Sequence, residues 1–274
     1  MPRPRAFPVV LAGFSAFLDL YATQPLLPFL ARTFHASALR VSLTVTAPTV
    51  AVALAAPVVG RLADRFGLRR MIVSSAFALA AATLLAATAV TLPQLIFWRF
   101  MQGLTAPGIF AIAIAYIHEE WPAATAGSAT AAYVGGTVIG GFTGRALMGV
   151  LAAARTWQTP FGVLGALNVA AAALLWWQLP TERRRRHGDQ ASMRGALSSH
   201  LRDTQLIAAY AVGFCILCVQ VATFTYVTFH LAAPPFGLST AALGWIFITY
   251  LLGAVVTPIA GRWIDGYGRR RSFV

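Results

Sequence analysis

The sequence predicts an all-α membrane protein that crosses the bilayer several times. Hydrophobic residues make up 58% of the 274 residues and charged residues only 11%, and the mean hydropathy is +0.70. So little polar surface cannot cover a water-soluble domain of this length. The apolar residues also fall into long runs, each close to the roughly 20 residues that a spanning helix needs.

We expect eight spanning helices, and the loops that connect them are short except for one. The first run is too long for the apolar part of a signal peptide and contains Asp19, so we interpret it as a retained helix. A basic connection at 181–203 separates a six-helix unit, 1–180, from a second part, 204–274. The expected spans cover residues 7–30, 43–61, 71–91, 94–117, 127–151, 157–180, 204–231 and 238–260.

The distribution of basic residues along the chain indicates its orientation in the membrane. Sixteen of the 21 basic residues fall in segments on the same side as the N-terminus, and three fall on the other side. Because cytoplasmic loops carry the excess of basic residues, we expect a cytoplasmic N-terminus. The formal net charge of +13 is then explained without nucleic acid, which we do not expect as a partner.

A short charged segment follows the second expected helix and occurs again 201 positions later. Residues 60–73 read GRLADRFGLRRMIV, and residues 261–274 read GRWIDGYGRRRSFV. A repeat at this offset indicates two related halves. Gly60 and Gly67 would let the chain turn sharply, and Asp64 suits an arginine or the N-terminal end of a neighbouring helix.

The first of these segments resembles the signature loop between helices two and three of the major facilitator superfamily. The second resembles the weaker copy between helices eight and nine. The resemblance implies a complete N-terminal six-helix bundle followed by the first two helices of a C-terminal bundle. A fragment, the product of a truncated gene and a shortened protein with a changed role are all compatible with such a chain. The resemblance also implies conformational gating by Gly60, Asp64, Arg65, Gly67, Arg69, Arg70, Gly261, Asp265, Gly268 and Arg270.

Two further expectations concern the partners of this gate. Glu119 and Glu120 follow the fourth span and could pair with Arg69 or Arg70, although a solvated acidic loop is the alternative. By the symmetry of the repeat, Asp265 is expected to face the start of the fifth helix near 127–128.

Asp19 is the one acidic residue deep inside an expected span. An unpaired carboxylate there would cost on the order of 2.5 to 3.5 kcal/mol, so it needs a partner or a proton. Counting helical rise places Arg99 within about 5 Å of its depth. Residues 99–103, RFMQG, also resemble the R-x-x-Q-G pattern of proton-coupled family members, which implies that Asp19 carries the proton and Arg99 tunes it. A permanent ion pair or hydrogen-bonded strut is the alternative.

Other polar side chains in apolar spans are candidates for a substrate cavity. The sequence YATQPLLP resembles a stretch of bacterial efflux members, with a polar seam between helices as the alternative interpretation. GGTVIGGFTGR, at 135–145, resembles the glycine-rich antiporter motif, but Gly141 stands where a proline is usual, and simple helix packing is the alternative. We expect Arg145 to extend to the outer face. The cavity candidates are Tyr21, Gln24, Gln102, Tyr133, Asn168 and Gln220.

These features predict a secondary transporter of the bacterial inner membrane that exports small organic solutes, such as drugs or sugars, by alternating access. The alternative is a non-transporting relative that is inert or associates with another membrane subunit. The expected partners are a small-molecule substrate, protons and the lipid bilayer. We expect no enzyme, because converging acid, base or metal groups are missing from the sequence, and no metal site. Without a G-x-x-x-x-G-K loop we expect no use of ATP, so the proton gradient takes the place of a cofactor.

Overall fold

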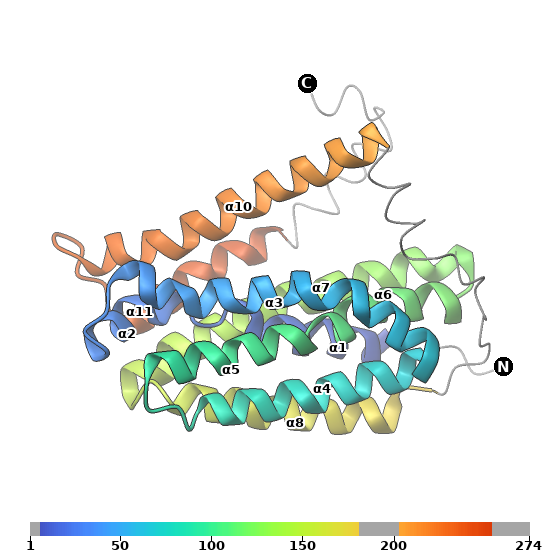
Figure 1. Ribbon diagram of the computed structural model, residues 1–274, viewed down its shortest axis with the longest axis horizontal. Helices are drawn as coiled ribbons and strands as arrows, with labels where there is room; N and C mark the ends of the chain where they lie inside the picture. Colours follow the sequence, from blue (N-terminus) through green and yellow to red (C-terminus); the bar gives the residue numbers. More distant parts are fainter. Residues whose placement is uncertain (1–5, 181–202, 254–274) are drawn as a thin grey trace.

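The computed structural model describes residues 6–180 and 203–253 (Figure 1). All regular secondary-structure elements of this part of the chain are helices, as predicted. Its elements are α1 (Ala6–Leu20), η1 (Gln24–Leu26), α2 (Leu27–Thr33), α3 (Ala38–Phe66), α4 (Leu68–Ala86), α5 (Leu92–Thr105), α6 (Pro107–Glu120), α7 (Ala123–Ala154), α8 (Thr159–Gln178), α10 (Thr204–Ala232), α11 (Thr240–Trp245) and η2 (Ile246–Ile248).

Seven helical stretches in the described residues are long and apolar enough to cross a membrane. They correspond to the first seven expected spans. The eighth is represented by the shorter apolar stretch Thr240–Gly253, and 254–260 lies outside the described residues. Also outside lie most of the basic connection and the second charged segment, with Gly261, Asp265, Gly268 and Arg270, so the expected neighbour of Asp265 stays a prediction.

Two of the spans are broken by prolines. The first span leaves the α-helix after Leu20 and continues as η1 and α2, each of which has a proline in its first turn. The fourth span is divided into α5 and α6 at Ala106, directly before Pro107. A proline lacks the N–H that a continuous helix needs, so each break leaves carbonyl groups available for other partners.

The turn between the second and third spans is tighter than expected. We predicted helices over 43–61 and 71–91, but α3 runs to Phe66 and α4 starts at Leu68. The residues 61–66 contain no helix breaker, so the helix continues to Gly67, whose φ of 92° few other residues adopt. The prediction that Gly60 also bends the chain is wrong, because Gly60 lies inside α3.

A ladder of glycines joins α1 to α7. A side chain at Gly136, Gly140 or Gly144 would collide with backbone atoms of Val10, Phe14 or Leu18, respectively. Both sets of residues are spaced by four, so they lie on the facing sides of the two helices. Small residues let membrane helices approach this closely. In this structure these three glycines therefore serve helix packing, which was the alternative interpretation of the glycine-rich stretch.

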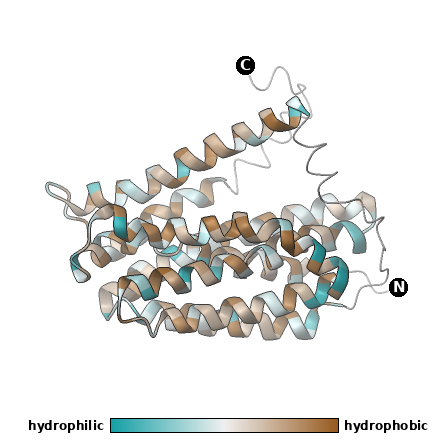
Figure 2. Ribbon diagram, viewed as in Figure 1, coloured by the Kyte–Doolittle hydropathy of each residue, from teal (hydrophilic) through white to brown (hydrophobic). Residues whose placement is uncertain are grey.

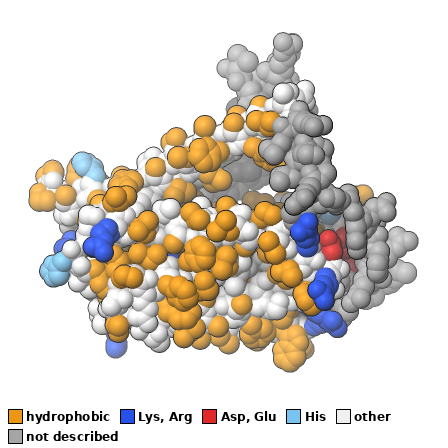
Figure 3. All heavy atoms as spheres, in the orientation of Figure 1, with side chains coloured by type: hydrophobic (Ala, Val, Ile, Leu, Met, Phe, Trp, Pro, Cys, Tyr) orange, Lys and Arg blue, Asp and Glu red, His pale blue; other side chains and the backbone are white. Residues whose placement is uncertain are grey.

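Apolar residues form two core clusters, one toward each end of the bundle. On α1, for example, Ala16 belongs to one cluster and Leu18 to the other, while on α8 Leu164 and Ala172 are divided in the same way. The outer surface is apolar across its middle, and basic side chains gather at its two ends (Figures 2 and 3). Polar side chains that lie between the two clusters are therefore buried about halfway along the bundle.

Helix α10 lies at a slant to the six-span bundle and diverges from it toward one end (Figure 1). Its buried residues, Thr225 and Thr228, both lie near its C-terminal end. At that end α11 packs closely on α7, because Gly149 of α7 meets the backbone of Thr240 and Gly244. The second part of the chain thus contacts the bundle at one end and separates from it toward the other.

Candidate functional site

The carboxylate of Asp19 is buried, with 1% of the residue exposed, in a cluster of polar side chains between the two apolar cores. Asn168 donates its Nδ2–H to Oδ2 of Asp19, and Thr83 Oγ1 lies 3.3 Å from Oδ1. Ser15, one turn before Asp19, donates its hydroxyl to Oδ1 of Asn168 at 2.9 Å. Because Ser15 occupies the amide oxygen, the amide nitrogen faces the carboxylate.

The hydroxyl of Thr83 has two acceptors but only one proton to donate. Its Oγ1 lies 2.8 Å from the Leu79 carbonyl and 3.3 Å from Asp19, and it also accepts a hydrogen bond from Gln102 Nε2 at 2.9 Å. An ionised Asp19 can accept the proton of Thr83. A protonated Asp19 can instead donate to Thr83, whose own proton then goes to Leu79. The cluster therefore satisfies its hydrogen bonds in either protonation state.

Arg99 is fully buried on α5 and binds backbone carbonyl groups of the first span and of α3. Its Nε donates to the carbonyl of Thr44 at 2.9 Å, and this carbonyl has no helical donor because Pro48 lacks an N–H. Its Nη2 donates to the carbonyl of Leu20 at 2.7 Å. That carbonyl is available because the N–H of Gln24 turns to Tyr21 instead.

The R-x-x-Q-G pattern has a structural explanation here. Arg99 Nη1 donates to Gln102 Oε1 at 2.5 Å, so Gln102 connects the guanidinium to Thr83 and from there to Asp19. A Cβ at Gly103 would lie 2.6 Å from the Cα of Pro48. Glycine at this position lets α3 and α5 approach closely enough for Arg99 to reach its acceptor on α3.

The structure brings Arg99 and Asp19 together in a way that the sequence did not specify. The Nη1 of Arg99 donates to the backbone carbonyl of Asp19 at 2.8 Å, and the residues described here contain no ion pair between the two side chains. The arginine therefore has the geometry of a hydrogen-bonded strut in this conformation. Its role as a tuner of Asp19, acting through Gln102 and Thr83, stays a prediction.

A second buried cation lies where the two parts of the chain meet. Arg145 is 3% exposed, so the expectation that it extends to the outer face is wrong. Its guanidinium carbon lies 5.3, 4.9 and 4.7 Å from the ring centroids of Tyr21, Phe247 and Tyr250. The expectation failed because the stretch after α11 and the broken part of the first span cover this face of α7.

The remaining cavity candidates divide between the two parts of the chain. Gln24 accepts a hydrogen bond from Arg145 Nε at 2.8 Å and donates one to Thr225 of α10 at 3.3 Å. Gln220 of α10 lies beside the Tyr250 side chain. Tyr133 is buried inside the bundle, where its hydroxyl donates to the Phe110 carbonyl at 3.2 Å.

The gating candidates lie around the turn between α3 and α4. Asp64, Arg65 and Arg70 are exposed. Arg69 donates from Nε and Nη2 to the carbonyls of Leu179 and Trp176, at 2.6 and 2.5 Å, and so connects the turn to the C-terminal end of α8. Cations stabilise this end of a helix. Glu119 and Glu120 end α6, and their pairing with Arg69 or Arg70 stays a prediction.

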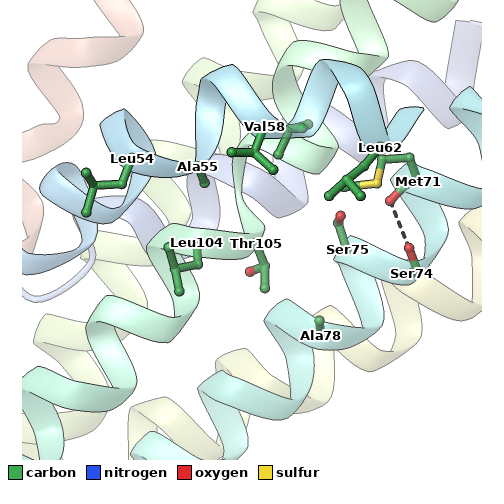
Figure 4. A pocket seen from close by; sticks show the side chains of 11 residues that line it. Leu54, Ala55, Val58, Leu62, Met71, Ser74, Ser75, Ala78, Leu104 and Thr105 are labelled. Carbon is green, nitrogen blue, oxygen red and sulfur yellow. Dashed lines mark hydrogen bonds between the residues drawn. The ribbon is translucent and has the colours of Figure 1, made fainter. Parts of the chain in front are cut away.

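An open groove of about 480 Å³ lies between α3, α4 and α5 (Figure 4). Its walls are largely apolar, with Leu54 and Val58 of α3, Met71 of α4 and Leu104 of α5. None of the predicted cavity residues lines it. The groove is therefore separate from both polar clusters.

Comparisons with known proteins agree with this architecture. The chain is 31% identical to the uncharacterised MFS-type transporter YybF of Bacillus subtilis, over 99% of the chain and 68% of that protein. It is 29% identical to the inner membrane transport protein YnfM of Escherichia coli, over 94% of the chain and 62% of that protein. The chain thus spans about two thirds of the length of these relatives.

Solved structures give the same fold at low sequence identity. A bacterial homologue of the human lysosomal transporter Spinster, in an inward-facing and unoccupied conformation, matches with a TM-score of 0.80 and 16% identity, over 97% of this chain and 63% of that one. The inward-open xylose transporter XylE of E. coli matches with a TM-score of 0.67 and 16% identity, over 96% and 69%. These proteins are transporters and not enzymes. Residues 9–274 match the model of the Major Facilitator Superfamily, and the chain belongs to this family of multi-pass membrane transporters.

Proposed function

We propose that this chain acts in proton-coupled export of small organic solutes, such as drugs or sugars, by alternating access. The observation that carries the proposal is the buried Asp19, whose partners can satisfy both the ionised and the protonated carboxyl group. A group that loads and releases a proton inside a membrane needs such partners, because an unsatisfied polar group there is costly.

The arrangement of the two parts supports alternating access. They meet where α11 packs on α7, and α10 separates from the bundle toward its N-terminal end. In transporters of related architecture, one bundle rocks against the other around a midplane site. The family neighbours with the stated inward-facing and inward-open conformations favour assigning the separated end to the cytoplasm, which agrees with the arginine distribution. Residence in a bacterial inner membrane is the matching localisation.

The test is proton flux in liposomes that contain the purified chain and a pH-sensitive dye. Ethidium and xylose serve as probes of the two solute classes. Adding either probe should dissipate a proton gradient across liposomes that contain the unaltered chain. Asp19→Asn should abolish this proton flux while leaving insertion of the chain into the membrane intact. Asp203→Asn is the control, because Asp203 is an exposed carboxylate that caps α10. Undiminished coupled flux through Asp19→Asn would exclude Asp19 as the carrier.

One observation favours the second candidate, a relative that works with another membrane subunit. Helix α10 has an apolar sequence, yet most of its surface is uncovered by the described residues. If the chain alone gives no flux with any probe but gives flux after a second polypeptide is added, this candidate replaces the first.

A further inference from the structure

Arg145 is a buried cation whose hydrogen bonds are only partly accounted for. Its Nε donates to Gln24 and its Nη1 to the Gly141 carbonyl at 2.6 Å. A guanidinium has five N–H donors, and within the described residues Nη2 makes no hydrogen bond. No carboxylate of the described chain pairs with Arg145, and the buried carboxylate of Asp19 is held by Asn168 and Thr83.

Aromatic rings take the place of a counter-ion in this conformation. Removing a charge from water is costly, and desolvated contacts between the cation and aromatic rings offset only part of that cost. Tyr21 belongs to the first span, but Phe247 and Tyr250 belong to the second part of the chain. When the two parts separate at this end, as alternating access requires, Arg145 loses two of its three rings.

We propose that Arg145 then binds the carboxylate of a small organic acid. The inference rests on the proposed alternating access and narrows its substrate class to organic anions, such as an acidic drug or a sugar acid. The planar guanidinium can hold the two oxygens of a carboxylate with two parallel hydrogen bonds. The Nη2 donors are free for this purpose, and Tyr21, which belongs to the first span and stays beside Arg145 when the two parts separate, offers its hydroxyl as a further donor.

The surroundings of Arg145 favour a transported anion over a permanent internal partner. The rings that shield it come from both parts of the chain, and Gln24 bridges it to Thr225 on α10. Its environment therefore changes whenever the two parts move. A ligand that binds only the separated state shifts the population toward that state, and this couples occupancy to the conformational change.

The test measures binding to the purified chain in detergent by calorimetry at constant ionic strength. The probes are benzoate and glucuronate, with benzamide and glucose as their uncharged counterparts. We expect at least one acid to bind and its uncharged counterpart to bind at least tenfold more weakly. Arg145→Gln should weaken acid binding at least tenfold, and Arg145→Lys, which keeps the charge without the planar fork, should weaken it less. Arg155→Gln, at an exposed arginine, is the control and should leave binding unchanged.

Size-exclusion chromatography and circular dichroism establish that each variant is folded. Tyr21→Phe keeps the ring and removes the hydroxyl, so a several-fold loss of acid affinity in this variant supports the site even if Arg145→Gln fails to fold. Equal binding of acids and uncharged probes, undiminished binding by folded Arg145→Gln, or no binding of either acid overturns the inference. Because no bilayer or gradient is used, the result is independent of whether the chain transports protons.

Discussion

Replacing Arg99 with methionine should lower the free energy of unfolding by about 2 to 4 kcal/mol. The side chain makes four hydrogen bonds that join the broken first span, α3 and α5, at distances of 2.5 to 2.9 Å. Side-chain hydrogen bonds between membrane helices contribute about 0.6 kcal/mol on average and up to about 1.7 kcal/mol. The bond to Gln102 lies within α5, so the three bonds that cross between helices account for a little under 2 kcal/mol at the average value.

Two further effects set the range of about 2 to 4 kcal/mol that we expect for Arg99→Met. The Thr44 carbonyl loses its main donor, because Pro48 offers none, and an unsatisfied buried carbonyl costs about 1 to 3 kcal/mol. Removal of the desolvated charge acts in the opposite direction. Arg99→Lys should lower the free energy of unfolding by less than Arg99→Met does. It should still be less stable than the unaltered chain, since an ammonium group cannot reach four acceptors that are arranged around a planar fork.

The assay is equilibrium unfolding in mixed micelles by sodium dodecyl sulfate, followed by far-ultraviolet circular dichroism. Arg155→Met makes the same chemical change at an exposed position and should shift stability by less than about 0.5 kcal/mol. A loss from Arg99→Met no greater than that of Arg155→Met would refute the strut. Arg99 would then have to act on Asp19 in some other way, for example through the pH dependence of transport.

The remaining predictions concern packing and proton exchange. Gly144→Ala should destabilise the chain by about 1 to 3 kcal/mol in the same unfolding assay, because its Cβ meets the Leu18 backbone, whereas Gly127→Ala meets nothing and should be neutral or slightly stabilising. Gly67→Ala should cost about 1 to 2 kcal/mol from its positive φ, and a neutral result would place the turn in another conformation. Thr83→Val should abolish proton-coupled flux while Thr83→Ser retains it, and equal flux through both variants would remove the hydroxyl from the exchange.

The spans were predictable because hydropathy and helix length are properties of the local sequence. The exact ends were not, since residues 61–66 are polar enough to leave the membrane and yet remain helical up to Gly67. The spacing of four among Gly136, Gly140 and Gly144 was visible in the sequence. Its partners on α1 were not, because the facing backbone atoms carry no sequence signal.

The polar cluster was predictable only in outline. Helical rise placed Asp19 and Arg99 at similar depth, but it could not show that Arg99 binds backbone carbonyls. Those acceptors exist because Pro48 and the break after Leu20 release them, which requires two helices to be seen together. Thr83 was missed, since a threonine in an apolar span is an unremarkable residue until its neighbours are known. The Gln102 of the R-x-x-Q-G pattern, one turn from Arg99, was the available hint that the chain of contacts continued.

The glycine ladder has a mechanical consequence. Where backbone touches backbone between α1 and α7, there is no layer of rotatable side chains to absorb a displacement. Helices α1 and α7 should therefore move as one rigid unit, which carries Asp19 on α1 and Arg145 on α7. A displacement of α1 that follows protonation of Asp19 should then also displace Arg145, because no flexible segment lies between them.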